Sequence, residues 1–390
     1  MKNIKAMGIA FIMFLVTITG VGIAAKNGIP VYNIRYGTWI STTKFGCNDG
    51  MKKLVDNDNV FAVFGSSELK HCQRSGFHAD SIYKNSDIKP VFIGKGGFQS
   101  LGHAIILGSI GQELKGKKVV ISVSPQWFKS YGFRKDAFGS MYSETNMIAF
   151  LKNKEISDET KDYVIKRIKE LTDENPTMWK NIRQDIKWYR DNNGNVIDTV
   201  RKNVHSALAN YKADTKLYIA SVVKGYSNDT NEGGKDRITH WNKLYKKAVK
   251  RGEKKSGHNR FGMSDRIYNK NYKEKVKKKA FKDLQYTSDS MEFDDLKCFI
   301  DICRQENIDV MMVMQPLNAK WADYTNFPKA KRDELYGAVR NFAKNNNVKL
   351  ADLTSMEYDD YMFEDDSHLA LKGLVYFNEQ IYNFYKQDKK

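Results

Sequence analysis

The chain has 390 residues, of which 41% are apolar, with 27 glycines, 6 prolines and 4 cysteines. This length and apolar content allow a full hydrophobic core and exclude a disordered or collagen-like chain. The formal net charge of +18 at pH 7 implies an anionic partner or surface. The cysteines are too few and too scattered for a disulfide framework, and no CxxC or HExxH pattern occurs. We therefore expect neither a metal nor an organic cofactor.

The N-terminal segment carries a candidate membrane anchor. Lysines flank an uncharged, mostly apolar run over residues 6–25. Twenty helical residues at about 1.5 Å each match a hydrocarbon core of about 30 Å. We predict an uncleaved single-pass anchor over residues 1–26, and a signal cleaved near residues 22–24 is the alternative. In both cases the leading lysines predict a cytoplasmic N-terminus and an extracellular body at the cell membrane, so nucleic acid is not the expected partner.

Three buried strands are predicted in the first third of the chain. Residues 60–64 are continuously apolar, as in strands covered on both sheet faces, and they end at Gly-Ser-Ser. Similar strands over 90–93 and 119–123 run into polar or glycine-rich loops, and a helix over 99–114 separates them. This arrangement predicts a parallel sheet with right-handed crossovers.

From about residue 129 to 287 the pattern is helical, and we predict a helical insertion within one α/β domain over 27–390. Within it, residues 243–282 hold 16 Lys or Arg against 3 Asp or Glu, a net +13 of the chain's +18. This stretch is either a solvated basic helix pair or a surface for anionic lipid headgroups or a polyanionic polymer. Near an anionic membrane each basic residue contributes about 1 kcal/mol.

The α/β pattern resumes after the insertion. We predict a helix over 291–306, a strand over 310–314, a helix over 330–345, a short strand over 348–353 and a closing helix over 372–385. The chain therefore adds two more strands to the same sheet.

Two loops carry candidate catalytic side chains. Ser67 follows the first strand, at the edge where open parallel sheets bind ligands, and its alternative role is to cap a helix. Asp365 precedes His368 by three residues, a spacing that lets a carboxylate orient an imidazole. Alternatively, an aspartate caps the closing helix and His368 is exposed. His71 and His103 are nearer to Ser67 in sequence, but we expect His71 on a helix leaving the serine loop and His103 in the core.

Five short motifs span most of the chain outside the insertion. They are Phe64-Gly65-Ser66-Ser67-Glu68-Leu69, Gly94-Lys95-Gly96-Gly97-Phe98-Gln99-Ser100-Leu101, Ser124-Pro125-Gln126-Trp127-Phe128, Gln315-Pro316-Leu317-Asn318 and Asp365-Asp366-Ser367-His368-Leu369. Their order resembles the SGNH (GDSL-like) hydrolases and, more narrowly, the DltD family of membrane-anchored proteins of teichoic-acid D-alanylation in Gram-positive bacteria. The resemblance implies an SGNH-like, flavodoxin-like parallel sheet.

The resemblance also implies roles for individual residues. Ser67 takes the place of the nucleophile, His368 of its general base and Asp365 of the residue that orients the base. The N–H groups of Ser67 and Gly97 would form an oxyanion hole. The general SGNH pattern has an acidic residue where this chain has Ser66, and it has an asparagine in the third motif. The nearest amide there is Gln126, which either donates to the oxyanion or packs beside Trp127.

By the same resemblance, the protein is a serine acyltransferase on the outer membrane face. It would move a D-alanyl group from a membrane donor to lipoteichoic or teichoic acid, with the membrane O-acyltransferase DltB as a partner. The basic insertion would attract the anionic polymer or the anionic membrane surface. Two alternatives stay open: an esterase or thioesterase with the same triad, and a non-catalytic scaffold that binds teichoic acid.

Overall fold

The computed structural model describes residues 2–191, 195–227 and 240–387, with the side chains of residues 2–5 left out. Five strands form one all-parallel sheet in the order β2-β1-β3-β4-β5. Their bounds are Val60–Phe64 (β1), Lys89–Ile93 (β2), Lys118–Val123 (β3), Asp309–Met314 (β4) and Lys349–Asp352 (β5). This strand order is the flavodoxin-like one. The predicted α/β class and the five predicted strands are confirmed.

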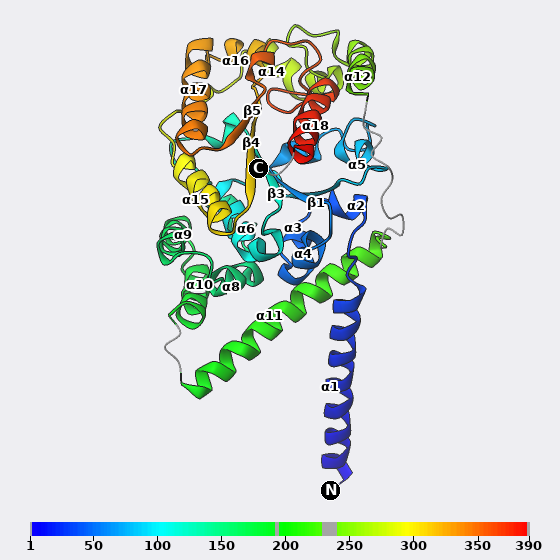
Figure 1. Cartoon of the computed structure of the whole chain (residues 1–390), viewed down its shortest axis with the longest axis vertical. Coiled ribbons are helices and arrows are strands. Elements are labelled where there is room, and N and C mark those ends of the chain that lie inside the picture. The colour runs from blue at the N-terminus through cyan, green and yellow to red at the C-terminus, as the bar shows by residue number, and fades with distance from the viewer. Residues whose placement is uncertain (1, 192–194, 228–239, 388–390) are drawn as a thin grey trace.

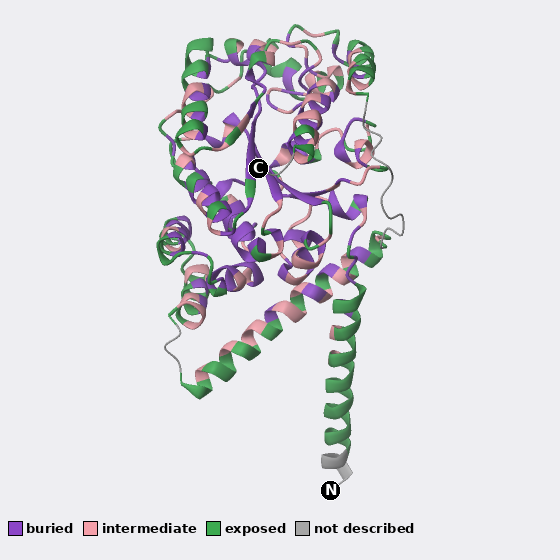
Figure 2. Cartoon of the chain, viewed as in Figure 1, coloured by how far each residue is buried: buried purple, intermediate pink, exposed green. Residues whose placement is uncertain are grey.

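Helices cover both faces of the sheet (Figure 1). Ala62 and Phe64 of β1 face a core shared with α4 (Asn48–Val55), α6 (Ser100–Leu114), α15 (Glu292–Gln305) and α17 (Lys329–Asn345). Phe61 and Val63 face the opposite core, which includes α5 (Ala79–Ile82) and α18 (Leu371–Lys386). All five residues of β1 are buried, which explains why the strand is apolar without alternation (Figure 2).

The segment between β3 and β4 is helical. Its helices before α15 are α7 (Lys135–Gly139), α8 (Glu144–Lys152), α9 (Asp158–Leu171), α10 (Pro176–Tyr189), α11 (Val196–Val223), α12 (Trp241–Ser256), α13 (Asp265–Ile267) and α14 (Lys273–Lys277). The basic stretch is not a free helix pair, because α12 packs on α18 and Phe261, Met263 and Tyr272 bury against Trp321. This stretch lies at the end of the molecule reached by the carboxyl ends of the strands (Figure 1).

At the opposite end, helix α1 (Lys2–Gly28) projects from the body (Figure 1). Residues 6–28 of this helix are long and apolar enough to cross a membrane, and a signal sequence near the N-terminus meets the same criteria. The chain then reaches the sheet through α4 and two short helices, α2 (Ile34–Gly37) and α3 (Thr42–Phe45). Loops elsewhere contain α16 (Ala319–Tyr324) and three-residue 3₁₀ turns η2 (Pro125–Trp127) and η4 (Thr354–Met356).

One local prediction is wrong. No helix carries His71, because the chain after β1 forms only the 3₁₀ turn η1 (Ser67–Lys70) and then an irregular loop. The backbone of this loop is left-handed at Cys72 (φ 55°) and Arg74 (φ 60°), and two such residues cannot continue a right-handed helix. The direction of the His71 side chain is therefore not set by a helix, and the side chain points toward the C-terminal part of the chain.

The ends of β1 and β2 meet at two glycines. Gly94 has φ of +131°, and a Cβ at this position would overlap the carbonyl oxygen of Gly65. Both the backbone conformation and the close approach require glycine. The contact fixes the loop that carries Ser67 against the glycine-rich loop after β2.

Replacing Gly94 by alanine should therefore destabilise the fold by at least about 2 kcal/mol, since it combines left-handed strain with a backbone clash. Urea unfolding of the full chain in detergent measures the change. Gly337→Ala is the matched control: this glycine lies within α17, and an added Cβ would meet no atom within 4 Å. The control should be neutral or stabilising by up to about 1 kcal/mol. Equal stability of the two variants would refute the role of the Gly65–Gly94 contact.

Candidate active site

The loop after β1 is shaped by an inward-pointing carboxylate. The buried Glu68 side chain accepts a hydrogen bond from the Ser66 N–H at 2.7 Å. A Cβ on Gly65 would lie 2.5 Å from Glu68 Oε1, so the glycine makes room for this carboxylate. Burial raises the pKa of Glu68 despite the hydrogen bonds that it accepts. The role of Glu68 is not predictable from the sequence, because nothing in the local pattern indicates that this side chain turns into the protein.

Ser67, His368 and Asp365 form one hydrogen-bonded chain. Ser67 Oγ lies 2.7 Å from His368 Nε2, and His368 Nδ1 lies 2.8 Å from Asp365 Oδ2. Ser67 and His368 are half-buried and Asp365 is buried. The alternative in which Asp365 merely caps the closing helix and His368 is exposed is therefore wrong. The arrangement has the connectivity of a nucleophile, a base and the residue that orients the base.

Charges around His368 favour its protonated form. Burial alone would lower the pKa of His368, but the hydrogen bond and charge of Asp365, together with Glu68 and Asp366, raise it above its usual value. Burial likewise opposes ionisation of Asp365, yet His368 and the N–H groups of Ser367 (3.0 Å) and His368 (2.8 Å) hold its pKa low. Asp365 is thus a stable anion, suited to stabilise an imidazolium.

The turn that carries Asp365 and His368 is braced on three sides. A β-bridge pairs Phe363 with Leu369, and the Glu364 N–H donates to the His368 carbonyl at 2.8 Å. The Asn318 N–H, in the loop after β4, donates to the Asp366 carbonyl at 3.0 Å. From the basic stretch, the Ser264 N–H donates to the Glu364 carbonyl at 3.0 Å. The Gln-Pro-Leu-Asn motif therefore supports the site, a role that the sequence alone does not indicate.

A second imidazole–carboxylate pair lies against the first. The ring of His71 stacks on that of His368, with centroids 3.7 Å apart and planes 10° apart. His71 Nδ1 hydrogen-bonds to Glu364 Oε2 at 2.7 Å. Burial opposes ionisation of Glu364, but the bond to His71 prevails and lowers its pKa. The proximity of Glu364 to Asp365 in sequence was the only available signal for this pair.

Two groups of side chains among the described residues have ligand atoms close enough together to hold a metal ion. Ligand atoms of His71, Asp365 and His368 lie within 4.8 Å of one another, as do those of a separate group, Glu144, Asp185 and His205. In the first group Asp365 and His368 already hydrogen-bond to each other, so an ion there would compete with this hydrogen bond. We assign no metal to either group.

The candidate oxyanion donors differ in the hydrogen bonds that they already make and in how close they lie to Ser67. The Gly97 N–H already donates to Ser66 Oγ at 3.1 Å, and Ser66 Oγ donates to the Lys95 carbonyl at 3.1 Å. Gly96 comes closer to the serine, since a Cβ there would lie 3.6 Å from Ser67 Cβ. Gln126 is half-buried in η2, after the strand that neighbours β1. Ser66 thus organises the glycine loop and does not hydrogen-bond to His368.

His103 is a core residue, as predicted. It is fully buried on α6, where its ring contacts those of Phe64, Phe98 and Trp127. Burial lowers the pKa of His103 to about 3, so its imidazole is neutral.

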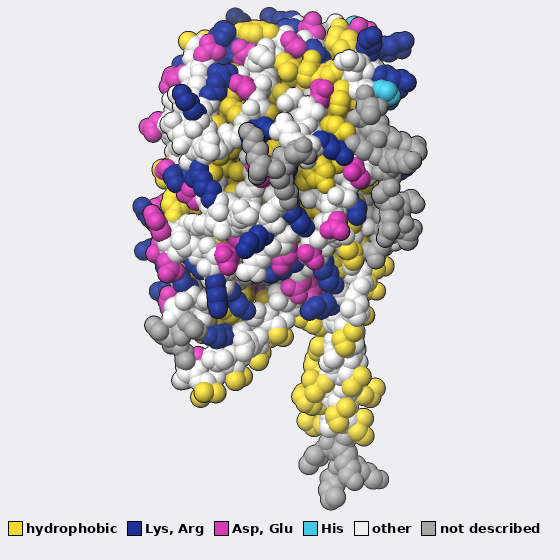
Figure 3. Space-filling view, in the orientation of Figure 1, with side chains coloured by type: hydrophobic (Ala, Val, Ile, Leu, Met, Phe, Trp, Pro, Cys, Tyr) yellow, Lys and Arg dark blue, Asp and Glu magenta, His cyan; other side chains and the backbone are white. Residues whose placement is uncertain are grey.

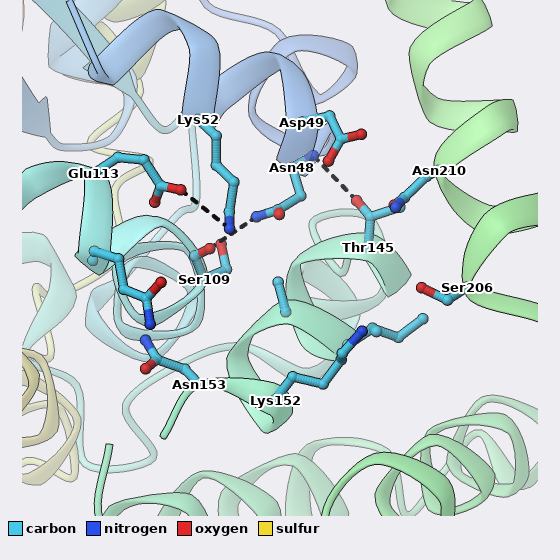
Figure 4. A pocket seen from close by; sticks show the side chains of 14 residues that line it. Asn48, Asp49, Lys52, Ser109, Glu113, Thr145, Lys152, Asn153, Ser206 and Asn210 are labelled. Atoms are coloured by element: carbon cyan, nitrogen blue, oxygen red, sulfur yellow. Dashed lines mark hydrogen bonds and ion pairs between the residues drawn. The ribbon is translucent and has the colours of Figure 1, made fainter. Parts of the chain in front are cut away.

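Two cavities bear on the location of the site. One of about 290 Å³ lies between α4, α6, α8 and α11, and its wall includes the Lys52–Glu113 ion pair at 3.2 Å (Figure 4). It contains no residue of the Ser-His-Asp chain. Another, of about 340 Å³, is lined by Cys72 and Glu364, next to the stacked histidines, and by basic residues of the insertion. The second cavity is the one that adjoins the candidate active site.

The sheet order, together with the placement of these motifs around it, defines an SGNH-like α/β protein. The family model described as DltD protein matches residues 37–386, so the chain belongs to the DltD family, which is involved in teichoic-acid D-alanylation. The chain is 29% identical to Protein DltD of Bacillus subtilis (strain 168) over 86% of this chain and 85% of that one. It is 27% identical to Protein DltD of Staphylococcus aureus (strain NCTC 8325 / PS 47), covering 84% and 82%, and 24% identical to that of Lacticaseibacillus rhamnosus, covering 85% and 79%.

The raised pKa of His368 predicts the pH dependence of Ser67. A general base must be neutral, so labelling of Ser67 by a fluorophosphonate should be lost as pH falls through a midpoint above 6.5. Asp365→Asn removes the charge that raises this pKa, so the midpoint should move to lower pH. The plateau rate should fall by roughly 10³–10⁴, as it does when the aspartate of a serine-protease triad is replaced. Mass spectrometry of the labelled peptide measures both quantities.

Asp366→Asn is the control for the plateau rate alone, because this neighbouring carboxylate bonds to Ser367 and acts on His368 only through its charge. Its plateau rate should stay close to that of the unmodified chain. An unchanged pH midpoint in Asp365→Asn would refute the assignment of Asp365 as the partner of His368.

Proposed function

We propose that this protein is a membrane-anchored, extracellular serine acyltransferase that adds D-alanyl esters to lipoteichoic or teichoic acid. The observation that carries the proposal is the continuous hydrogen-bonded chain from Ser67 through His368 to Asp365. Membership in the DltD family supplies the pathway. Residues 6–28 of α1 serve as the anchor, and Lys2 and Lys5 keep the N-terminus cytoplasmic.

In the first half-reaction, Ser67 Oγ attacks the carbonyl carbon of the D-alanyl donor, and the Ser67 proton moves to His368 Nε2. Collapse of the tetrahedral intermediate breaks the bond to the leaving group, which takes the proton from His368. Asp365 stabilises the transient imidazolium. In the second half-reaction, a hydroxyl of the polymer gives its proton to His368 and attacks the acyl-serine. The ester bond to Ser67 breaks, and Ser67 Oγ regains the proton.

The oxyanion requires donors that point at the reacting carbonyl. We assign this role to the N–H groups of Ser67 and of the glycine loop. Gly97 qualifies once its bond to Ser66 Oγ is exchanged for one to the oxyanion, and Gly96 is the nearer neighbour of Ser67. Gln126 is proposed as a side-chain donor because its loop follows the adjacent strand.

The acceptor is a polyanion, and the cavity beside the site is suited to one. Lys254, Lys255 and Arg266 line this cavity. The carboxylates in the same wall have other partners: Glu364 bonds to His71, and Asp265 bonds to His258. The cavity therefore offers positive charge beside Glu364, whose partner His71 stacks on His368, and positive charge near the base is what a phosphodiester chain needs. The acyl donor and its supplier, for which we propose DltB, would lie in the membrane.

Ser67→Ala should abolish ester-linked D-alanine in cells at normal protein abundance, since no other described hydroxyl bonds to His368. Ser66→Ala is the matched control. It disturbs the glycine loop but keeps the nucleophile, so it should retain part of the activity and full labelling of Ser67. Chemical release of D-alanine from isolated polymer measures the product. Wild-type D-alanine in Ser67→Ala would reject catalysis and favour a binding scaffold, whereas rapid hydrolysis of simple esters by the purified chain would favour an esterase.

A further inference from the structure

Helix α11 carries an apolar face that the rest of the body leaves uncovered. Five aliphatic side chains in its N-terminal half are 52–80% exposed. They are Val196, Ile197, Val200, Val204 and Leu208. Single exposed aliphatic residues are common, but a contiguous row on one element marks an interaction surface.

The row is a true helical face. Val200, Val204 and Leu208 recur every four residues, which places them on one side of the helix. The buried residues of α11, including Ala209 and Leu217, lie on the side that packs against the body. Beyond Leu208 the outward face continues through Tyr211 to Ile219 and Val222, and the last two are again more than half exposed. We call these outward residues, from Val196 to Val222, the outward face of α11.

The outward face is continuous with α1. The two helices pack together, and a Cβ added at Gly22 would lie 2.8 Å from the Tyr211 ring. The ring of Tyr218 occupies the corresponding space beside Gly28. Apolar side chains follow the lower edge of α11 and join the apolar surface of α1 (Figure 3). The face thus starts at the helix that is able to enter a membrane and extends sideways from it.

Basic residues border this face as they do in interfacial helices. Arg201, Lys212 and Lys216 are exposed and follow one flank of the apolar row by the helical repeat. Long basic side chains in this position keep their charge at lipid phosphates while their methylene stems cover apolar surface.

We propose that the outward face of α11 contacts the lipid interface of the membrane, as a second contact that runs oblique to α1 (Figure 1). Interfacial amphipathic helices bury their apolar face about 5–10 Å into the boundary between headgroups and acyl chains. The inference rests on the membrane anchoring by α1 proposed above. Two non-parallel helices that share one bilayer fix the orientation of the body, which a single spanning helix leaves free to rotate.

The test measures the depth of single labelled positions in the full chain, reconstituted in nanodiscs of phosphatidylglycerol and phosphatidylcholine. Bimane is attached to Val204→Cys on the outward face, to Val16→Cys in α1 and to Glu253→Cys, an exposed position on α12. Cys72, the one free cysteine that is not buried among the four, is replaced by serine in every variant. Quenching is compared between lipids with a nitroxide near the headgroup and lipids with a nitroxide deep in the acyl chain.

We expect the label at Val204 to be quenched more by the shallow nitroxide, the label at Val16 more by the deep one, and that at Glu253 by neither. Quenching at Val16 with none at Val204 would overturn the inference and leave the anchor intact. Loss of quenching at both positions would overturn the anchor as well. Shielding of Val204 that appears only when a membrane protein partner is added would overturn the lipid contact in favour of a protein contact. None of these outcomes depends on catalysis.

Discussion

The hydrogen bond between Ser67 and His368 joins residues 301 positions apart, and the site exists only if the whole sheet is assembled. Parallel strands make this contact possible, because the end of β1 and the chain beyond β5 reach the same edge. Three local devices then fix the two loops: the Gly65–Gly94 contact, the Glu68 carboxylate under the serine loop, and the bridge from Phe363 to Leu369. The long-range bond therefore depends on the short-range contacts that hold its two ends.

Charge is arranged around two imidazoles in this site. Asp365 and Glu364 each bind one histidine, and the two rings stack face to face. The stack holds the ring of His71 against that of His368, with centroids 3.7 Å apart, and Glu364 holds His71 in place. This second pair therefore helps to fix the plane of the His368 ring.

Much of the fold was predictable from sequence because its signals are local. A strand such as Val60–Phe64 is apolar throughout, since both faces of the sheet are covered, and the helix predicted over 99–114 is found over Ser100–Leu114. The residues of the hydrogen-bonded chain, Ser67, Asp365 and His368, were identifiable because five different short motifs follow one another in an order that resembles the DltD family. The inward turn of Glu68 and the stacking of His71 were not predictable. Both depend on contacts with loops that are distant in sequence, and left-handed residues after β1 ended the helix expected at His71.

Under the proposed function, one end of the molecule binds the membrane and the other end carries the active site. Helix α1 and the N-terminal half of α11 lie at one end, whereas α12, α14 and α16, beside the carboxyl ends of the strands, lie at the other (Figure 1). A body held by both α1 and α11 keeps Ser67 at the edge that faces away from the bilayer. A polymer that extends outward from the membrane passes this edge, where Lys254 and Lys255 offer positive charge. Under the same proposal the acyl donor starts at the membrane, so the D-alanyl group has to cross the height of the body to reach Ser67.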